Sequence, residues 1–290
     1  MMEEDVKAFL EHLAAQRKYS PNTLAAYRND LSQLVAYLKS GGVVGEINPA
    51  EPDLSAGALA GYLRSLKERK YRPSTVARKV AAAKLFLKFM VERGRVRGDL
   101  APLLSSPQVS KPRPSTLSVS EVRRLLAAPS KLSTSEAKRD KAMLELLYAT
   151  GLRASELMAL NVTDIDIRGN TVRCVSRGSK LRVIPIERHV AKMVKEYIDH
   201  VRPELLSHED ELALFLNRRG DRLTRQGFWQ IVQGYADRTG LGGKVTPRSL
   251  RHSFAAHRLK SGADLESVQA LLGHAHISTT KAYLQVAADS

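Results

Sequence analysis

The chain has 290 residues, 43% of them hydrophobic, and this length predicts two domains with buried cores. Lysine and arginine outnumber acidic residues 46 to 30, and the formal net charge of +16 is typical of proteins that bind polyanions such as DNA. There is no apolar run long enough for a membrane span, no signal peptide and only one cysteine, Cys174, so we expect a cytoplasmic protein without disulfides or membrane contact.

Four apolar stripes with helical spacing occupy the first hundred residues. They begin near residues 3, 21, 59 and 73, and the second and fourth start at the pairs Ser20-Pro21 and Arg72-Pro73, which favour helix initiation. Helices joined by short connections predict a small four-helix bundle. We place this N-terminal domain at residues 1–104.

Positive charge is concentrated in the second half of this domain. Residues 64–97 contain twelve lysines and arginines but only two acidic residues. A solvated helix face is the ordinary explanation, and a stripe that follows a DNA phosphate backbone is the functional one. We predict DNA contact through four residues of the fourth helix: Arg78, Lys79, Lys84 and Lys88.

A proline-rich linker at 105–116 precedes a second domain at 117–290. Helices are predicted at about 119–128, 136–149, 188–201 and 224–239. Between the second and third of these, three β-branched runs separated by turn residues predict a small antiparallel sheet. The expected fold is therefore mainly α-helical with one small β-sheet.

The C-terminal region combines residue types that suit an anion site. Arg248 and Arg251 are three residues apart and share a helix face. His274 follows a predicted helix at 265–272, and Tyr283 lies nine residues after that histidine. Each feature alone is more often a solvated or packing residue, so the combination carries the prediction.

Three motifs contain these residues and resemble one family. They are Thr150-Gly151-Leu152-Arg153-Ala154-Ser155-Glu156, Arg251-His252-Ser253-Phe254-Ala255, and Leu271-Leu272-Gly273-His274 followed by Tyr283. Together they resemble the tyrosine recombinase (phage integrase) family, of the Xer type, over nearly the whole chain. The segment 19–27 is similar to the core-binding, SAM-like domain that precedes the catalytic domain in that family.

The resemblance implies a site-specific DNA recombinase that works through a 3′-phosphotyrosyl intermediate. Arg153 and Arg251 would bind the scissile phosphate, His274 would donate a hydrogen bond, Tyr283 would attack phosphorus, and Glu156 would brace the site. Neither a metal ion, ATP nor any other cofactor is implied. Clustered histidines in the C-terminal region keep a metal site open as an alternative.

Two positions depart from the family pattern. Arg177 stands where relatives have the catalytic lysine, and Arg248 stands where they have a histidine. Because an arginine hardly loses its proton, Lys180 becomes an alternative general acid, and Arg248 can stabilise the phosphate without accepting a proton. Only residues 284–290 follow Tyr283, so we expect less surface for exchange between protomers.

The implied partners are double-stranded DNA and other recombinase subunits. Self-association on DNA from dimer to tetramer, or pairing with a paralogous recombinase, is expected in the bacterial nucleoid. A DNA-binding regulatory or architectural protein with impaired cleavage is the alternative function, and a type IB topoisomerase is a weaker one. Chromosome-dimer resolution and mobile-element integration both stay open.

Overall fold

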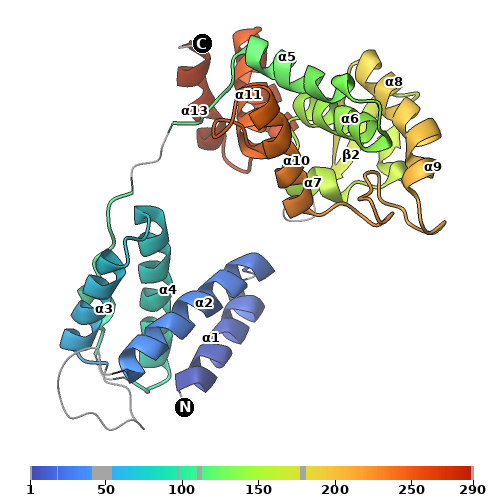
Figure 1. Ribbon diagram of the computed structural model, residues 1–290. Coiled ribbons are helices and arrows are strands. Elements are labelled where there is room, and N and C mark those ends of the chain that lie inside the picture. The colour runs from blue at the N-terminus through green and yellow to red at the C-terminus, as the bar shows by residue number, and fades with distance from the viewer. Residues whose placement is uncertain are drawn as a thin grey trace. The chain divides into compact units, whose positions relative to one another are not determined.

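The chain divides into two compact units, Met1–Lys111 and Pro112–Ser290 (Figure 1). The computed structural model describes residues 2–17, 19–40, 54–96, 98–109, 113–176 and 181–288. Each unit has its own cluster of buried apolar side chains. Within the described ranges, no helix combines the length and the apolar character needed to cross a membrane.

The first unit contains the four predicted helices. They are α1 (Met2–Arg17), α2 (Pro21–Lys39), α3 (Ala56–Glu68) and α4 (Pro73–Glu92), followed by a short 3-10 turn, η1 (Ala101–Leu103). Ser20 caps α2 by accepting a hydrogen bond from the Thr23 amide, and Pro21 occupies the first turn. Phe9 packs against Phe86 at the centre of the bundle, so the predicted apolar stripes do meet in one core.

One of the predicted DNA contacts, Lys79, is wrong because its side chain is buried. Its ammonium group lies inside the bundle, is 3% exposed, and donates to Asp30 at 2.9 Å and to Gln33 at 2.8 Å. A buried charge requires such partners, so Lys79 joins α4 to α2 inside the bundle and does not lie on the surface. Arg78 also pairs with Asp30 but remains partly exposed.

The second unit is a helical body with one small sheet. Its helices, with two 3-10 turns and one π turn, are α5 (Val119–Ala127), η2 (Ala128–Lys131), α6 (Ser135–Thr150), α7 (Ala154–Ala159), η3 (Val162–Asp164), α8 (Arg188–Glu196), η4 (Tyr197–Val201), α9 (Arg202–Leu205), α10 (Arg225–Arg238), α11 (Pro247–Lys260), α12 (Leu265–Leu272) and α13 (Ile277–Ala288). Ser118 and Glu121 form the expected capping box at the start of α5.

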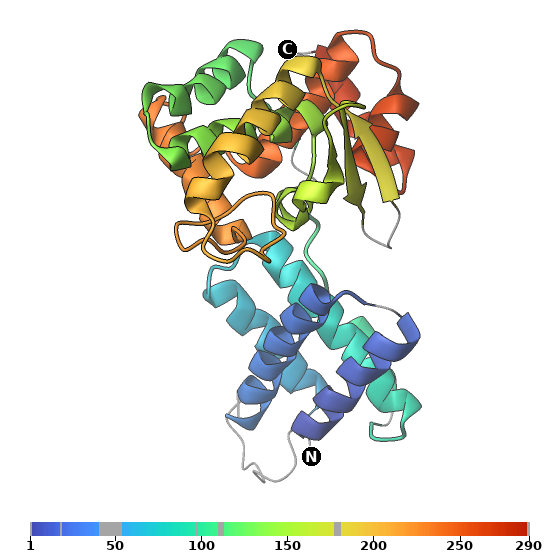
Figure 2. The same ribbon diagram turned by 90° about the vertical axis from the view of Figure 1, so that its right-hand side faces the viewer.

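The predicted antiparallel sheet is confirmed, with strands in the order β1 (Ile165–Asp166), β2 (Thr171–Val175) and β3 (Leu181–Pro185) (Figure 2). In the β2–β3 pair, Cys174 lies opposite Arg182. Arg177 and Lys180 belong to the segment 177–180 between β2 and β3, which lies outside the described residues.

Helix α11 organises the C-terminal half of the second unit. It contacts α6 on one side and α13 on the other (Figure 1). The start of the unit is fastened to the same helix, because the Leu117 amide donates to Ser253 Oγ at 2.8 Å. Arg248 and Arg251 project from α11, so one rigid helix joins the entry of the unit to its candidate site.

Candidate active site

A buried carboxylate, Glu156, holds three arginines together. Arg153 donates to Glu156 Oε1 at 2.7 Å, and Arg182 donates to Oε2 at 2.8 Å. Nη1 of Arg251 lies 3.7 Å from Oε2. Burial raises the pKa of Glu156, but the hydrogen bonds of Arg182 and Arg153 and the charge of Arg182 together lower that pKa by more. Glu156 is therefore ionised and shared by the three arginines, and the bracing role that the family resemblance implies for it stays a prediction.

A sharp turn brings Arg153 to this carboxylate, and helix α11 brings Arg251. Gly151 ends α6 in the left-handed conformation at φ +60°, which places Arg153 at the start of α7. Arg251 reaches across from α11 and donates to the carbonyl oxygens of Gly151 at 2.6 Å and Leu272 at 2.7 Å. The Arg251 side chain is 7% exposed and that of Arg153 is 32% exposed. Burial, and then Arg153, lower the pKa of Arg251 to about 10, so it remains protonated at neutral pH.

His274 stands at the turn between α12 and α13, directly after the left-handed Gly273. Its Nε2 lies 3.2 Å from Arg251 Nη2 and must accept that hydrogen bond, because a guanidinium has only donors. Nδ1 then carries the proton and donates to Thr280 Oγ1 at 2.9 Å. Burial, followed by the charge of Arg251, lowers the pKa of His274 to about 4, so the imidazole is neutral at pH 7.

Tyr283 lies in α13 between two histidine rings. Its ring is nearly parallel to that of His274, with centroids 6.2 Å apart, and tilted against that of His252 at 5.4 Å. The residue is 5% exposed. Burial raises the pKa of the Tyr283 phenol, and the nearby charges of Arg251 and Arg248 oppose that rise. The predicted nucleophile is therefore buried and protonated beside the predicted phosphate-binding arginines.

Arg248 lies at the exposed edge of this cluster. Its Nε donates to Nε2 of His252 at 3.3 Å. Burial, and then Arg248, lower the pKa of His252 to about 4. His252 was not predicted as a site residue, although it directly follows Arg251 in the motif. Among the described residues, no group of three or more histidine, cysteine or carboxylate side chains is arranged to hold a metal ion.

Arg182 is a second residue that sequence reasoning missed. Its side chain is 11% exposed, whereas its strand neighbours Leu181 and Val183 are 63% and 56% exposed. A half-buried strand normally turns its apolar residues inward. This reversal becomes visible only once the buried face of the strand is known, so the sequence pattern alone gave no signal for Arg182.

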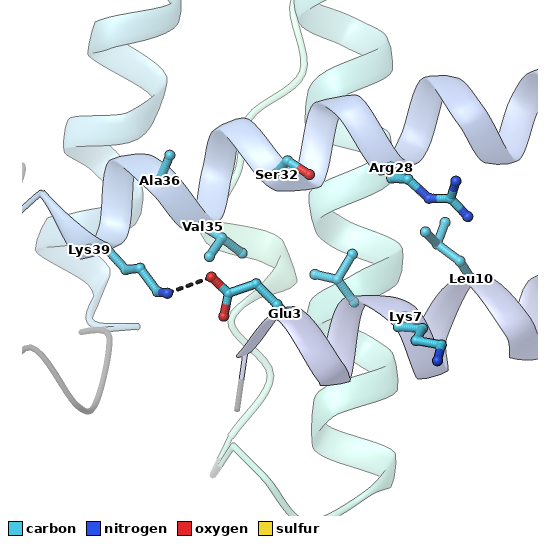
Figure 3. A pocket seen from close by; sticks show the side chains of 9 residues that line it. Glu3, Lys7, Leu10, Arg28, Ser32, Val35, Ala36 and Lys39 are labelled. Atoms are coloured by element: carbon cyan, nitrogen blue, oxygen red, sulfur yellow. Dashed lines mark hydrogen bonds and ion pairs between the residues drawn. The ribbon is translucent and has the colours of Figure 1, made fainter.

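A groove in the first unit has a different character (Figure 3). It has a volume of about 500 Å³ and lies between α1 and α2, with an apolar floor that includes Val6, Leu10 and Val35. Lys39 crosses its rim to pair with Glu3, as the dashed line shows. Its lining includes Ser32 but neither a tyrosine nor a histidine, whereas the Glu156 cluster has both beside its arginines, so we place the reaction at that cluster.

Paired guanidiniums beside a tyrosine are the groups that a tyrosine-based phosphoryl transfer requires. The model of the Phage integrase family matches residues 115–289, and that of the phage integrase N-terminal SAM-like domain matches residues 6–94. The chain belongs to the phage integrase family and is a site-specific tyrosine recombinase, an enzyme that cuts and rejoins DNA.

Individual relatives agree with this assignment. Tyrosine recombinase XerC of Roseiflexus sp. (strain RS-1) is 47% identical over 288 residues, which cover 98% of this chain and 90% of the relative. The XerH site-specific recombinase bound to palindromic difH substrate, a post-cleavage complex, has a TM-score of 0.76 at 19% identity, covering 99% of this chain and 92% of that one. A lambda integrase dimer bound to a COC′ core site has a TM-score of 0.74 at 16% identity, covering 97% and 94%. These two structures share the fold.

Proposed function

We propose that Tyr283 attacks the scissile phosphate of duplex DNA while Arg153 and Arg251 bind its non-bridging oxygens. One observation carries this proposal: both guanidiniums meet the same carboxylate, Glu156, beside the turn that leads to the tyrosine. Forked N–H donors suit the oxygens of a phosphate, and their charge stabilises the transition state.

The bond changes balance without a nucleotide. The Tyr283 Oη–P bond forms, the P–O5′ bond breaks, and O5′ takes a proton to leave as a hydroxyl. The phenol gives its proton to a base, and the neutral imidazole of His252, whose ring centroid lies 5.4 Å from that of Tyr283, is the candidate. The 5′-hydroxyl of a partner strand reverses the step, so the energy of the phosphodiester is conserved in the protein–DNA ester.

The role proposed for His274 depends on its charge. In the free protein its Nε2 accepts a hydrogen bond from Arg251, so it can donate to a phosphate only after it gains a proton. A phosphate placed among these arginines offsets their charge and so raises the pKa of His274 from about 4. We propose that DNA binding itself converts this histidine into a donor.

Covalent capture tests the proposal. Duplexes selected by the protein from a random library supply its binding site, and a nick close to the cleaved phosphate lets the cut strand diffuse away. A protein–DNA adduct formed in EDTA without nucleotide supports the proposal. Specific binding without any adduct would favour the alternative of a DNA-binding regulator that no longer cleaves.

Lys180 is the proposed general acid, with Arg177 as a further phosphate ligand. Both lie outside the described residues, and the assignment rests on the pKa difference between a lysine and an arginine. Lys180→Ala should slow single-turnover cleavage by about 10²–10⁴-fold, and a sulfur in place of the bridging O5′ should restore it, because a thiolate leaves without a proton. Weaker binding with an unchanged cleavage rate would retire Lys180 as the acid.

The proposed DNA contacts of the first unit predict a strong dependence on salt. Arg78, Lys84 and Lys88 remain at least partly exposed on α4. With roughly six to ten phosphate contacts over both units, affinity should fall by about 10³–10⁵-fold between 50 and 200 mM salt. Fluorescence anisotropy with a labelled duplex measures this slope, and a flat response would contradict DNA binding through these charges.

The assembly on DNA is also a proposal. The similar lambda integrase structure is a dimer on its core site. We propose that this chain likewise binds its DNA site as a dimer and joins two sites as a tetramer, with itself or with a paralogous recombinase. Two bound sites would supply the partner strand whose hydroxyl completes the exchange.

A further inference from the structure

Arg182 joins three parts of the active site that are distant in the sequence. It donates to both oxygens of Glu156, at 3.3 Å and 2.8 Å, and to Ser176 Oγ at 2.5 Å. The third part is the turn at Gly273, where an added Cβ would lie 2.2 Å from Arg182 Nη1. The guanidinium therefore fills the space beside the turn that carries His274.

The strand register explains how one side chain makes these contacts. Arg182 lies opposite Cys174, so the two side chains share a face of the sheet, and Ser176, two residues beyond Cys174, follows on that face. Cys174 is buried, so this face is turned toward the core. Ser176 is also the last described residue before the segment 177–180.

Placing a third positive charge at Arg182 costs electrostatic free energy. Arg153 and Arg251 already surround Glu156, and a third guanidinium beside one carboxylate adds repulsion between like charges. An apolar side chain of similar size would commonly fill a buried space at lower cost. The charged side chain provides hydrogen bonds that an apolar one could not, and these link Glu156 to Ser176.

We propose that Arg182 is a positioning residue for proton transfer to the leaving 5′ oxygen. It holds Ser176, the last described residue before the segment 177–180, and through Glu156 it links Ser176 to Arg153, the proposed phosphate ligand. This inference rests on the proposed function, in which a residue of the segment 177–180 gives its proton to O5′ as the P–O5′ bond breaks.

Two substrates separate this role from a merely structural one. They are the nicked duplex with oxygen at the bridging 5′ position and the same duplex with sulfur there, both cleaved in a single turnover at saturating protein. Ser176→Ala removes only the hydroxyl that Arg182 binds, and Arg182→Lys keeps the charge but loses the forked geometry. Arg173→Lys is the matched control, because Arg173 is an exposed arginine on the opposite face of the same hairpin.

We expect Ser176→Ala and Arg182→Lys to slow cleavage of the oxygen substrate by about 10²-fold, because a misplaced acid transfers its proton poorly. On the sulfur substrate both variants should cleave within about threefold of the wild-type rate, because no proton is needed. The Arg173→Lys control should match the wild type on both substrates.

Equal losses on both substrates would overturn the inference, because they would place Arg182 in phosphate binding or in folding. Wild-type rates for Ser176→Ala and Arg182→Lys would overturn it as well. A wild-type protein that cleaves neither substrate would instead contradict the proposed function. Ser176→Ala removes a single hydroxyl, so it keeps the test decisive where Arg182→Lys does not fold.

Discussion

Tyr283→Phe should abolish the covalent protein–DNA adduct while leaving DNA binding and folding nearly intact. The substitution removes the attacking oxygen and should lower the rate by about 10⁴-fold or more. It keeps the ring that packs between His252 and His274, so α13 keeps its attachment. Adduct is measured on denaturing gels with the nicked duplex, and binding by anisotropy.

Three other tyrosines provide the controls for this result. Tyr197 donates to the Leu214 carbonyl at 3.0 Å, Tyr235 donates to Asp140 at 3.0 Å, and the Tyr148 hydroxyl lies 2.8 Å from His257 Nδ1. Their hydroxyls are thus engaged elsewhere, and Tyr148→Phe should form adduct at the wild-type rate. An adduct that persists in the Tyr283→Phe protein would mean that one of these tyrosines, and not Tyr283, is the nucleophile.

Arg153→Lys should slow adduct formation by about 10²–10³-fold at saturating protein, with only a small change in binding. A lysine keeps the positive charge but has no planar fork, so it cannot hold Glu156 and also present paired donors to two phosphate oxygens. Single-turnover rates with the nicked duplex measure the effect. Arg168→Lys, at an exposed turn of the same unit, is the control and should behave as the wild type.

Arg251→Lys should slow adduct formation as much as Arg153→Lys does, and it should also make the folded protein less stable. Arg251 is almost fully buried and satisfies the carbonyl oxygens of Gly151 and Leu272, which a single ammonium cannot reach together as well. Its melting temperature should therefore fall, whereas that of Arg153→Lys should hardly change. A rate within threefold of the wild type for Arg153→Lys, in a folded protein, would contradict its role as a phosphate ligand.

Local sequence signals were sufficient for most of the fold. Capping residues such as Ser20 and Ser118, and glycines such as Gly151 and Gly273, mark helix ends through short-range contacts that sequence spacing already encodes. The family motifs placed Arg153, Arg251, His274 and Tyr283, and the structure brings these four side chains together. Their catalytic roles remain predictions.

The errors and omissions concern partners that are distant in the sequence. Lys79 shares its helix with other lysines that are at least partly exposed. Only the packing of α2 against α4 shows that Lys79 is buried in an ion pair with Asp30, 49 residues away. Arg182 resembled an ordinary strand residue until the register placed it opposite Cys174 and beside Glu156. Helix periodicity cannot reveal either pairing, because both depend on how separate elements meet.

The last helix depends on the reactive side chain for its own attachment. Thr280 and Tyr283 are the buried residues of α13, and Tyr283 completes a small cluster with Phe254, Val268 and Leu272. If Tyr283 is the nucleophile, as proposed, the side chain that anchors α13 in the core also becomes the ester to DNA. Movement of the cut strand would then act directly on the last helix, so a subunit that has formed its ester would hold α13 differently from one that has not.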